Sequence, residues 1–134
     1  MLLWSILHLT GVQAINADYE RLGQPSVTLD AIRHFRQLDS KAPGHPEYHW
    51  VSGVGTTTGP LGQGIATNVG MAIARKFLGA RYNRPTFDIF DYSIYAICGD
   101  GRMMEGVGSE AASLAGHLAL GDLCWIYDNN HVTL

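Results

Sequence analysis

Two short apolar segments near the end of the chain, with a helical pattern between them, constrain its fold most. Residues 93–98 (Ser-Ile-Tyr-Ala-Ile-Cys) and 123–127 (Leu-Cys-Trp-Ile-Tyr) have the continuous apolar character of strands buried on both faces. Between them, apolar residues recur at the i, i+4, i+7, i+8 and i+11 positions of a helix: Val107, Ala111, Leu114, Ala115 and Leu118. This order of strand, helix and strand indicates a βαβ unit. We therefore predict an α/β fold, with a parallel sheet and helices on both of its faces.

The preceding part of the chain predicts three helices and a long loop. Residues 2–10 have the apolar spacing of a short buried helix, and Thr28 is a good N-cap for a second one. Residues 12–27 contain helix breakers and are expected to be irregular. Residues 39–60 are rich in Gly, Pro and Thr, and structureless segments of this length are usually functional or mobile. Helical spacing then predicts the third helix over residues 61–78.

Three glycines, Gly62, Gly64 and Gly70, lie within the third helical pattern. Each glycine in a helix interior costs up to about 1 kcal/mol relative to alanine. Two interpretations are open: another group approaches the helix backbone closely at these positions, or the helix packs tightly against a neighbour. The sequence favours neither.

Composition limits the class of protein and its partners. The chain has 134 residues, about the length of one domain, and 46% of them are hydrophobic, enough to form a core. The formal net charge is −3 and no Lys/Arg cluster occurs, which argues against a nucleic-acid partner. The apolar residues 1–7 are too short to span a membrane. Because both ends of the sequence are abrupt, we expect a piece of a larger protein.

The two cysteines bear on location. Cys98 and Cys124 both lie in the predicted strands, so we expect buried, reduced thiols and an intracellular, cytoplasmic protein. A disulfide between them is the alternative.

Oxygen-bearing side chains follow both predicted strands. Asp100 stands between Gly99 and Gly101 after the first strand, and Asn130 ends the segment Tyr-Asp-Asn-Asn after the second. The carboxyl ends of parallel strands share one edge of the sheet, where ligands of open α/β sheets bind. Asp100, Asn130 and the backbone carbonyl of Val132 are therefore candidate ligands for Mg²⁺ or Ca²⁺, which prefer oxygen donors. Gly99 and Gly101 leave room for a phosphate group near the main chain, although Gly-Asp-Gly is also a common turn.

Five segments of the chain resemble transketolase. They are Gly44-His45-Pro46-Glu47, Thr56-Thr57-Thr58-Gly59-Pro60-Leu61-Gly62-Gln63-Gly64, Gly99-Asp100-Gly101, Met104-Glu105-Gly106 and Ser113-Leu114-Ala115-Gly116. The resemblance covers nearly the whole chain and matches the amino-terminal, diphosphate-binding domain of that family. It implies that residues 1–134 form part of a thiamine-diphosphate-binding fold, with the second and the carboxyl-terminal domains outside this sequence.

The resemblance implies a cofactor and the residues that hold it. Thiamine diphosphate would bind through Mg²⁺ or Ca²⁺, with Asp100, Asn130 and the Val132 carbonyl as the metal ligands. Gly99 would contact the diphosphate through its backbone, and Gly101 lies in the same segment.

Further roles are implied away from the metal ligands. Gly59 and Leu61 would line the rings of the cofactor, and His45 would face the reacting carbon and the hydroxyl groups of the donor substrate. Glu105 and Glu110 would lie at a subunit interface. Without the resemblance, His45 has the character of a solvated loop side chain, and the two glutamates have that of surface acids.

The implied activity is transfer of a two-carbon ketol unit from a ketose phosphate to an aldose phosphate, with the cofactor as the electron sink. Dihydroxyacetone synthase is similar, and a truncated, non-catalytic piece is a further alternative. A homodimer or a second chain would supply the pyrimidine-binding domain, so we expect no turnover from these 134 residues alone. Gly55, where the family usually has Glu, and a long loop over residues 13–25 depart from the family and bear on substrate preference and local packing.

Overall fold

The two predicted strands pair in parallel in the computed structural model of the chain, which describes residues 1–132. β3 (Ile94–Gly99) lies beside β4 (Leu123–Asp128), and the chain crosses between them through α4 (Asp100–Met103) and α5 (Gly106–His117). This confirms the βαβ unit and the α/β class. Gly99 lies opposite Asp128, so the two strands end level with each other. The residues that follow them therefore emerge at the same edge.

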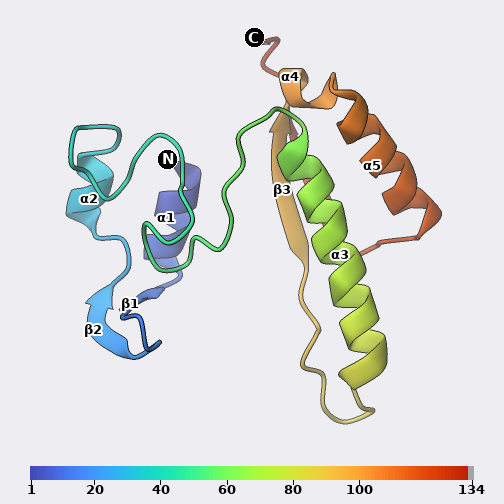
Figure 1. Cartoon of the computed structure of the whole chain (residues 1–134), viewed down its shortest axis with the longest axis horizontal. Coiled ribbons are helices and arrows are strands. Elements are labelled where there is room, and N and C mark those ends of the chain that lie inside the picture. The colour runs from blue at the N-terminus through green and yellow to red at the C-terminus, as the bar shows by residue number, and fades with distance from the viewer. Residues whose placement is uncertain (133–134) are drawn as a thin grey trace. The chain divides into compact units, whose positions relative to one another are not determined.

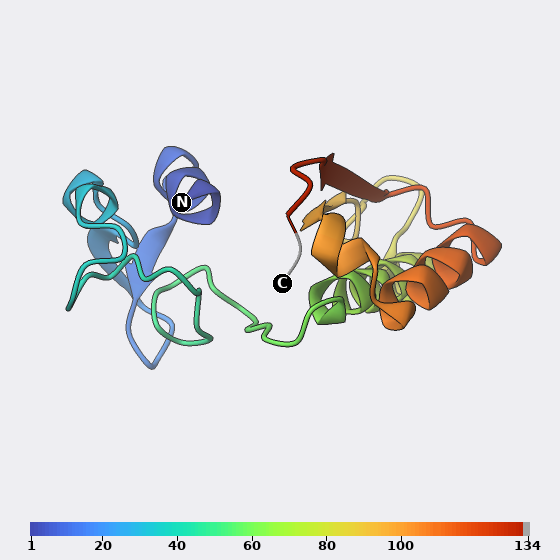
Figure 2. The ribbon, with the colours of Figure 1, turned by 90° about the horizontal axis from the view of Figure 1, so that it is seen from above.

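Within the described residues, the strand pair is buried on one face only. Alternate residues of β3 face the protein interior, whereas Tyr95 and Ile97 between them are 66% and 52% exposed. α3 (Gln63–Tyr82) packs against β3 and α5, and Figure 2 shows α3 and α5 on the same side of the strands. The prediction of two fully buried strands is therefore wrong for this chain, because residues 1–132 supply no helix layer to the second face.

The two cysteines have different environments. Cys98 is buried beneath α3, and burial raises the pKa of its thiol. Cys124 is exposed on β4, contrary to the prediction that both are buried. Both are free thiols, so the disulfide alternative does not hold in this structure.

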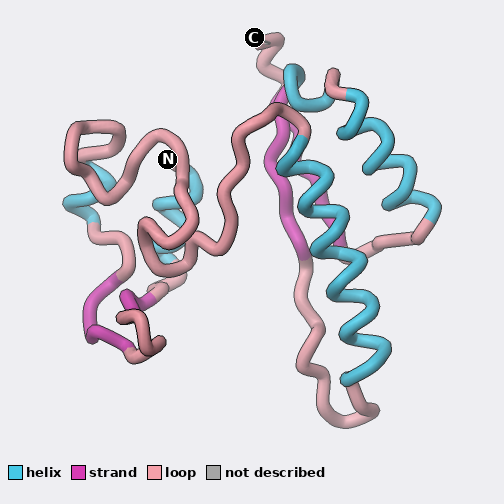
Figure 3. The backbone as a smooth tube through the Cα atoms, viewed as in Figure 1, coloured by secondary structure: helices cyan, strands magenta, loops and turns pink. Residues whose placement is uncertain are grey.

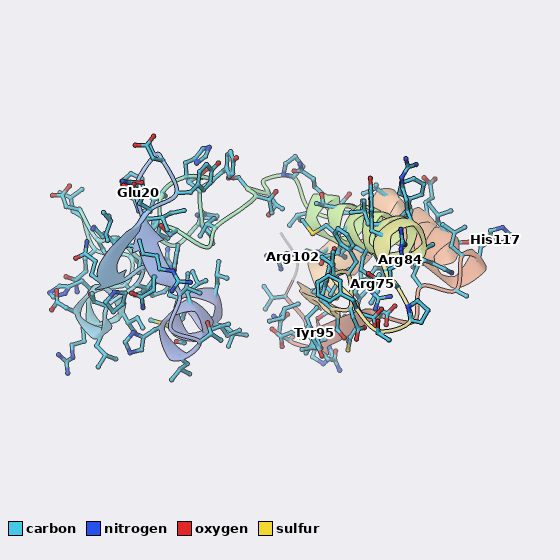
Figure 4. The ribbon with its side chains drawn as sticks, turned by 90° about the horizontal axis from the view of Figure 1, so that it is seen from below. Glu20, Arg75, Arg84, Tyr95, Arg102 and His117 are labelled. Carbon is cyan, nitrogen blue, oxygen red and sulfur yellow. The ribbon has the colours of Figure 1, made fainter. Side chains whose placement is uncertain are left out.

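α3 is the longest helix of the described residues (Figure 1). Polar contacts fix its second half. The helix buries Ile65, Val69 and Ala72. Its Arg75 side chain, labelled in Figure 4, is paired with Asp122 at 2.5 Å and with Asp91 at 3.0 Å. The ammonium group of the neighbouring lysine, Lys76, donates to the carbonyl oxygen of Leu118 at 2.6 Å, at the end of α5. α3 is thus tied to the end of the βαβ unit at which both strands begin and α5 ends. No helix within residues 1–132 has the length and apolar character needed to cross a membrane.

Residues Met1–Thr57 form a separate compact unit. It contains α1 (Leu2–Leu9), β1 (Gln13–Ile15), β2 (Arg21–Pro25) and α2 (Leu29–Arg33). Its core consists of buried side chains from α1, from the residue before the Thr28 N-cap and from the segment after α2: Trp4, Leu7, Val27, Ala42, Val51 and Val54. The N-cap prediction at Thr28 is confirmed, since its hydroxyl accepts a hydrogen bond from the Ala31 N–H.

The expectation of an irregular segment over residues 12–27 is wrong, because β1 and β2 pair there as an antiparallel hairpin. The Asn16 side chain makes the turn: its oxygen accepts from the N–H groups of Asp18 and Glu20, at 3.0 and 2.9 Å. The hairpin therefore forms through local hydrogen bonds, without the long alternation of apolar and polar residues by which hairpins are usually predicted.

The predicted loop over residues 39–60 is confirmed, and it is anchored rather than free (Figure 3). Val51 and Val54 are buried in the core of the first unit. The Trp4 indole N–H donates to the Pro43 carbonyl oxygen at 3.0 Å, two residues before His45. Packing and this hydrogen bond therefore give the loop a defined path.

The glycines at the start of α3 differ in their surroundings. Gly62 caps the helix with φ of +82°, and a Cβ built there would lie 2.8 Å from Val107 Cγ1 and 2.9 Å from Glu105 Cβ. A Cβ at Gly70 would meet nothing within 4 Å. Close approach therefore explains Gly62 and does not explain Gly70.

We expect opposite effects from two alanine substitutions in this region. Gly62→Ala should lower the free energy of unfolding by about 1–3 kcal/mol, because of the left-handed backbone and the contact with α5. Gly70→Ala should raise it by about 0.5–1 kcal/mol, because alanine favours the helix and meets no obstacle. Urea denaturation of the two variants and the wild type measures both values. Equal effects of the two substitutions would contradict the close approach at Gly62.

Candidate metal and diphosphate site

Asp100, the first residue of α4, is hydrogen bonded to the loop that follows β4. The His131 backbone N–H donates to its Oδ2 at 2.7 Å. The Tyr127 hydroxyl donates to its Oδ1. These contacts form because both strands run in parallel and end level, which brings their exits together. The predicted convergence of the two strand exits is present in the structure.

Asn130 lies at the same corner. Its Nδ2 donates to Asp128 Oδ2 at 2.9 Å, and its Oδ1 accepts from the Val132 N–H at 2.9 Å. The same Nδ2 lies 3.8 Å from the place that a Cβ on Gly99 would occupy. His131, between Asn130 and Val132, has a left-handed backbone with φ of 55°. Together with the His131 N–H, these contacts hold residues 130–132 beside Asp100.

The charge state of Asp100 follows from its hydrogen bonds. The Tyr127 hydroxyl, and then the N–H of His131, hold the pKa of the Asp100 carboxyl below its ordinary value. The same bond raises the pKa of Tyr127, because loss of its proton would place two negative charges in contact. At neutral pH Asp100 is therefore a carboxylate and Tyr127 a neutral phenol.

The donor atoms at this corner fit a hard divalent cation with an anionic partner. Asp100 would supply one charged oxygen, Asn130 an amide oxygen and Val132 a backbone carbonyl. Mg²⁺ and Ca²⁺ accept such oxygens and fill other positions with water or phosphate. Within residues 1–132 no group of three or more His, Cys, Asp or Glu side chains is arranged to bind a metal ion.

Gly99, the last residue of β3, has open space beside its Cα. A Cβ there would stand 3.6 Å from the Asp128 carbonyl oxygen, 3.7 Å from Arg102 Nη1 and 3.8 Å from Asn130 Nδ2. A side chain would thus fill a small space bordered by a guanidinium group (Arg102 is labelled in Figure 4). The absence of a side chain leaves that space open. Gly101 is the second residue of α4.

The other predicted site residues lie outside this hydrogen-bonded corner. Gly59 and Leu61 precede α3 in the second unit, and the Gly59 N–H donates to Gln63 Oε1 at 3.3 Å. His45 is exposed in the loop of the first unit. A hollow of about 460 Å³ on that unit is lined by other residues of the loop, including His49 and Gly55. The roles of Gly59, Leu61 and His45 stay predictions.

Glu105 and Glu110 differ in exposure. Glu105 is the N-cap residue of α5 and is half-buried, with its Cβ close to Gly62. Glu110 is exposed on the second turn of α5. Their place at a subunit interface stays a prediction.

Three side chains at the corner were not singled out by the sequence: Tyr127, Asp128 and Arg102. Each lies within three residues of Asp100 or Asn130, and this closeness in the sequence could have indicated them as neighbours of the site. Their contacts depend on the strand register, however. The pairing of Cys98 with Tyr127 places the tyrosine across from the residue two before Asp100.

The hydrogen bonds to Asp100 predict a pH-dependent stability difference. Since the pKa of Asp100 is lowered on folding, its carboxylate stabilises the folded state above the unfolded value of about 3.9, and this is lost as the pH falls through the folded-state pKa. Asp100→Asn should therefore be less stable than wild type near neutral pH, with a smaller difference at about pH 3. Urea midpoints measure this.

Asp88→Asn is the matched control, because the Asp88 carboxylate is exposed and makes no hydrogen bond or ion pair within the described residues. If the difference in stability between Asp100→Asn and wild type stays constant with pH, the stabilising role of the Asp100 carboxylate is contradicted.

Comparison with known proteins identifies the family. Residues 1–134 match the family model described as transketolase, thiamine diphosphate binding domain. The chain is 54% identical over 134 residues to the transketolase of Geobacillus stearothermophilus and 51% identical to transketolase 1 of Escherichia coli. In each case the match covers 100% of this chain and 18% of the relative, so the chain spans less than a fifth of their length.

Solved structures agree with the sequence comparison. Transketolase from Leishmania mexicana matches with a TM-score of 0.72 and 54% identity, over 83% of this chain and 16% of that one. Pichia stipitis transketolase in complex with sedoheptulose-7-phosphate matches with a TM-score of 0.72 and 52% identity, over 80% of this chain and 16% of that one. The chain belongs to the transketolase family and corresponds to part of its thiamine diphosphate binding domain.

Proposed function

We propose that this chain is the part of a transketolase that holds thiamine diphosphate through a divalent metal ion. The protein would move a two-carbon ketol unit from a ketose phosphate to an aldose phosphate. The observation that carries the proposal is the hydrogen-bonded corner of Asp100 and the loop after β4. The family model matches this chain from residue 1 to residue 134. Sugar phosphates as substrates agree with the relative solved with sedoheptulose-7-phosphate.

In this proposal the corner binds the metal and the diphosphate. Asp100, Asn130 and the Val132 carbonyl hold Mg²⁺ or Ca²⁺ with oxygen donors. Gly99 and Gly101 allow the diphosphate to reach the main chain, and the uncovered space beside Gly99 supports this. The lowered pKa of Asp100 favours the charged form that a cation requires.

Residues before α3 and in the long loop serve the reacting end of the site. Gly59 and Leu61 line the cofactor rings. When bound, the cofactor supplies an electron sink for cleavage of the carbon–carbon bond. His45 faces the donor sugar, orients its hydroxyl groups and stabilises charge that develops on oxygen. The anchoring of Pro43 by Trp4 supports a positioning role for this loop, because a fixed backbone orients a side chain.

The proposal includes a second copy or a second chain. Glu105 and Glu110 lie at the interface, and the partner supplies the pyrimidine-binding domain. The apolar, exposed face with Tyr95 and Ile97 supports further covering structure, since monomeric proteins rarely leave such faces open. Two free thiols support a cytoplasmic location.

Asp100→Ala in the full-length protein that carries this chain should weaken the binding of Mn²⁺ with thiamine diphosphate by more than about 100-fold. Loss of a residue that only hydrogen bonds a metal ligand already lowers metal affinity by about 10–100-fold. Ketol transfer should fall in parallel and should not return after addition of the same metal. Isothermal titration calorimetry measures the binding, and Asp88→Ala serves as the control at an exposed carboxylate. Wild-type binding by Asp100→Ala would exclude Asp100 as a ligand.

His45→Ala tests the substrate-facing role separately. We expect kcat/KM for the ketose donor to fall about 100-fold, because a positioned proton-handling side chain contributes about that much, while binding of metal and cofactor stays unchanged. His49→Ala, an exposed histidine in the same loop, is the matched control and should keep wild-type kinetics. Loss of cofactor binding in His45→Ala, or unchanged kinetics, would contradict the proposed role.

A further inference from the structure

Tyr127 is the only side chain within residues 1–132 that hydrogen bonds the Asp100 carboxylate. Its hydroxyl donates to Oδ1, while the His131 backbone N–H donates to Oδ2 at 2.7 Å. The two donors come from one short segment: Tyr127 is the second-last residue of β4, and His131 lies in the loop after it. Both oxygens of the carboxylate are therefore held.

We propose that Tyr127 is a positioning residue that fixes the Asp100 carboxylate in the orientation in which it binds the metal ion. This inference rests on the proposed function, because it assigns Tyr127 a task at the same site. A carboxylate has about four lone-pair positions, so one hydrogen bond to each oxygen leaves acceptor capacity for a cation. Groups that hydrogen bond a ligating carboxylate set its direction and are needed for full metal affinity.

The strand register explains why Tyr127 can reach Asp100. Tyr127 lies opposite Cys98, and Gly99 lies opposite Asp128, so the phenol projects from β4 beside the point where β3 passes into α4. The position of the hydroxyl is thus set by the parallel ladder and does not depend on a flexible loop. The lowered pKa of Asp100, for which Tyr127 is the main cause, agrees with a bond that favours the charged ligand.

A purely structural role for the same bond is the competing interpretation. In that case the hydroxyl would only close the corner of the folded chain, and its removal would lower stability without a specific effect on the metal. The ring of Tyr127 is 52% exposed, so Tyr127→Phe keeps the packing of the ring and removes one donor. The two roles can therefore be separated by a single substitution.

The experiment uses the full-length protein that carries this chain and Mn²⁺ as the metal, in the presence of thiamine diphosphate. Free Mn²⁺ is measured by electron paramagnetic resonance. We expect Tyr127→Phe to raise the Kd for Mn²⁺ about 10-fold, the lower end of the 10–100-fold range for such residues. The melting temperature of the metal-free protein should fall no further than in Asp100→Asn, which loses the charge that the same bond stabilises. The activity lost at limiting Mg²⁺ should return at saturating Mg²⁺, as a rise in KM for the metal without a change in kcat.

Tyr95→Phe is the matched control. Tyr95, labelled in Figure 4, lies on β3 one residue before the buried Ala96, is 66% exposed and makes no side-chain hydrogen bond within the described residues. Its substitution removes the same hydroxyl group from the same strand pair, away from Asp100. We expect wild-type affinity for Mn²⁺ from this variant.

Asp100→Ala, measured alongside, separates the two proposals. If Asp100→Ala loses Mn²⁺ binding and Tyr127→Phe binds as wild type does, the positioning role is wrong and the proposed function stands. If excess Mg²⁺ does not restore the activity of Tyr127→Phe, the bond is structural and the inference is overturned. If Asp100→Ala binds Mn²⁺ normally, the metal site itself is wrong, and the inference is overturned with it.

Discussion

The level, parallel pairing of β3 and β4 is the interaction on which the described site depends. Six residue pairs from Ile94–Leu123 to Gly99–Asp128 keep the two strands in step. Because they end together, the start of α4 and the loop after β4 meet, and the His131 N–H reaches Asp100. A shift of one residue would turn alternate side chains to the other face and separate these groups. The helices support this pairing: α3 covers one face of the strands, and its Arg75 pairs with Asp122 at the end of the crossover.

Sequence patterns predicted the elements of this unit well and its contacts only in part. The strands, the helix between them and the convergence of their exits follow from apolar runs and from the common edge of parallel strands. The hydrogen bond from Tyr127 to Asp100 depends on the register, which no periodicity encodes. Burial was overestimated at Tyr95, Ile97 and Cys124, because an apolar run predicts cover on both faces while the described residues supply it on one.

The first unit shows a different limit of sequence patterns. Its hairpin depends on the Asn16 side chain bonding the N–H groups of Asp18 and Glu20, a contact too local to produce alternation. The loop that contains His45 is rich in breakers, yet buried valines and the Trp4 indole fix its course. For His45, Gly59, Leu61, Glu105 and Glu110, the transketolase match is the support for a role, and their roles remain to be tested.

Gly62 has a mechanical consequence for the segment beside it. Its Cα lies so near the stem of Glu105 and the methyl group of Val107 that no side chain fits between them. Gly59 and Leu61 stand within three residues of this contact, on the side that leads into α3. A movement of the first turn of α5 toward Gly62 would therefore press on the backbone that carries these two residues. A bulkier side chain or a bound partner that pushed this turn toward Gly62 would displace the segment. The displacement would pass through van der Waals contact alone.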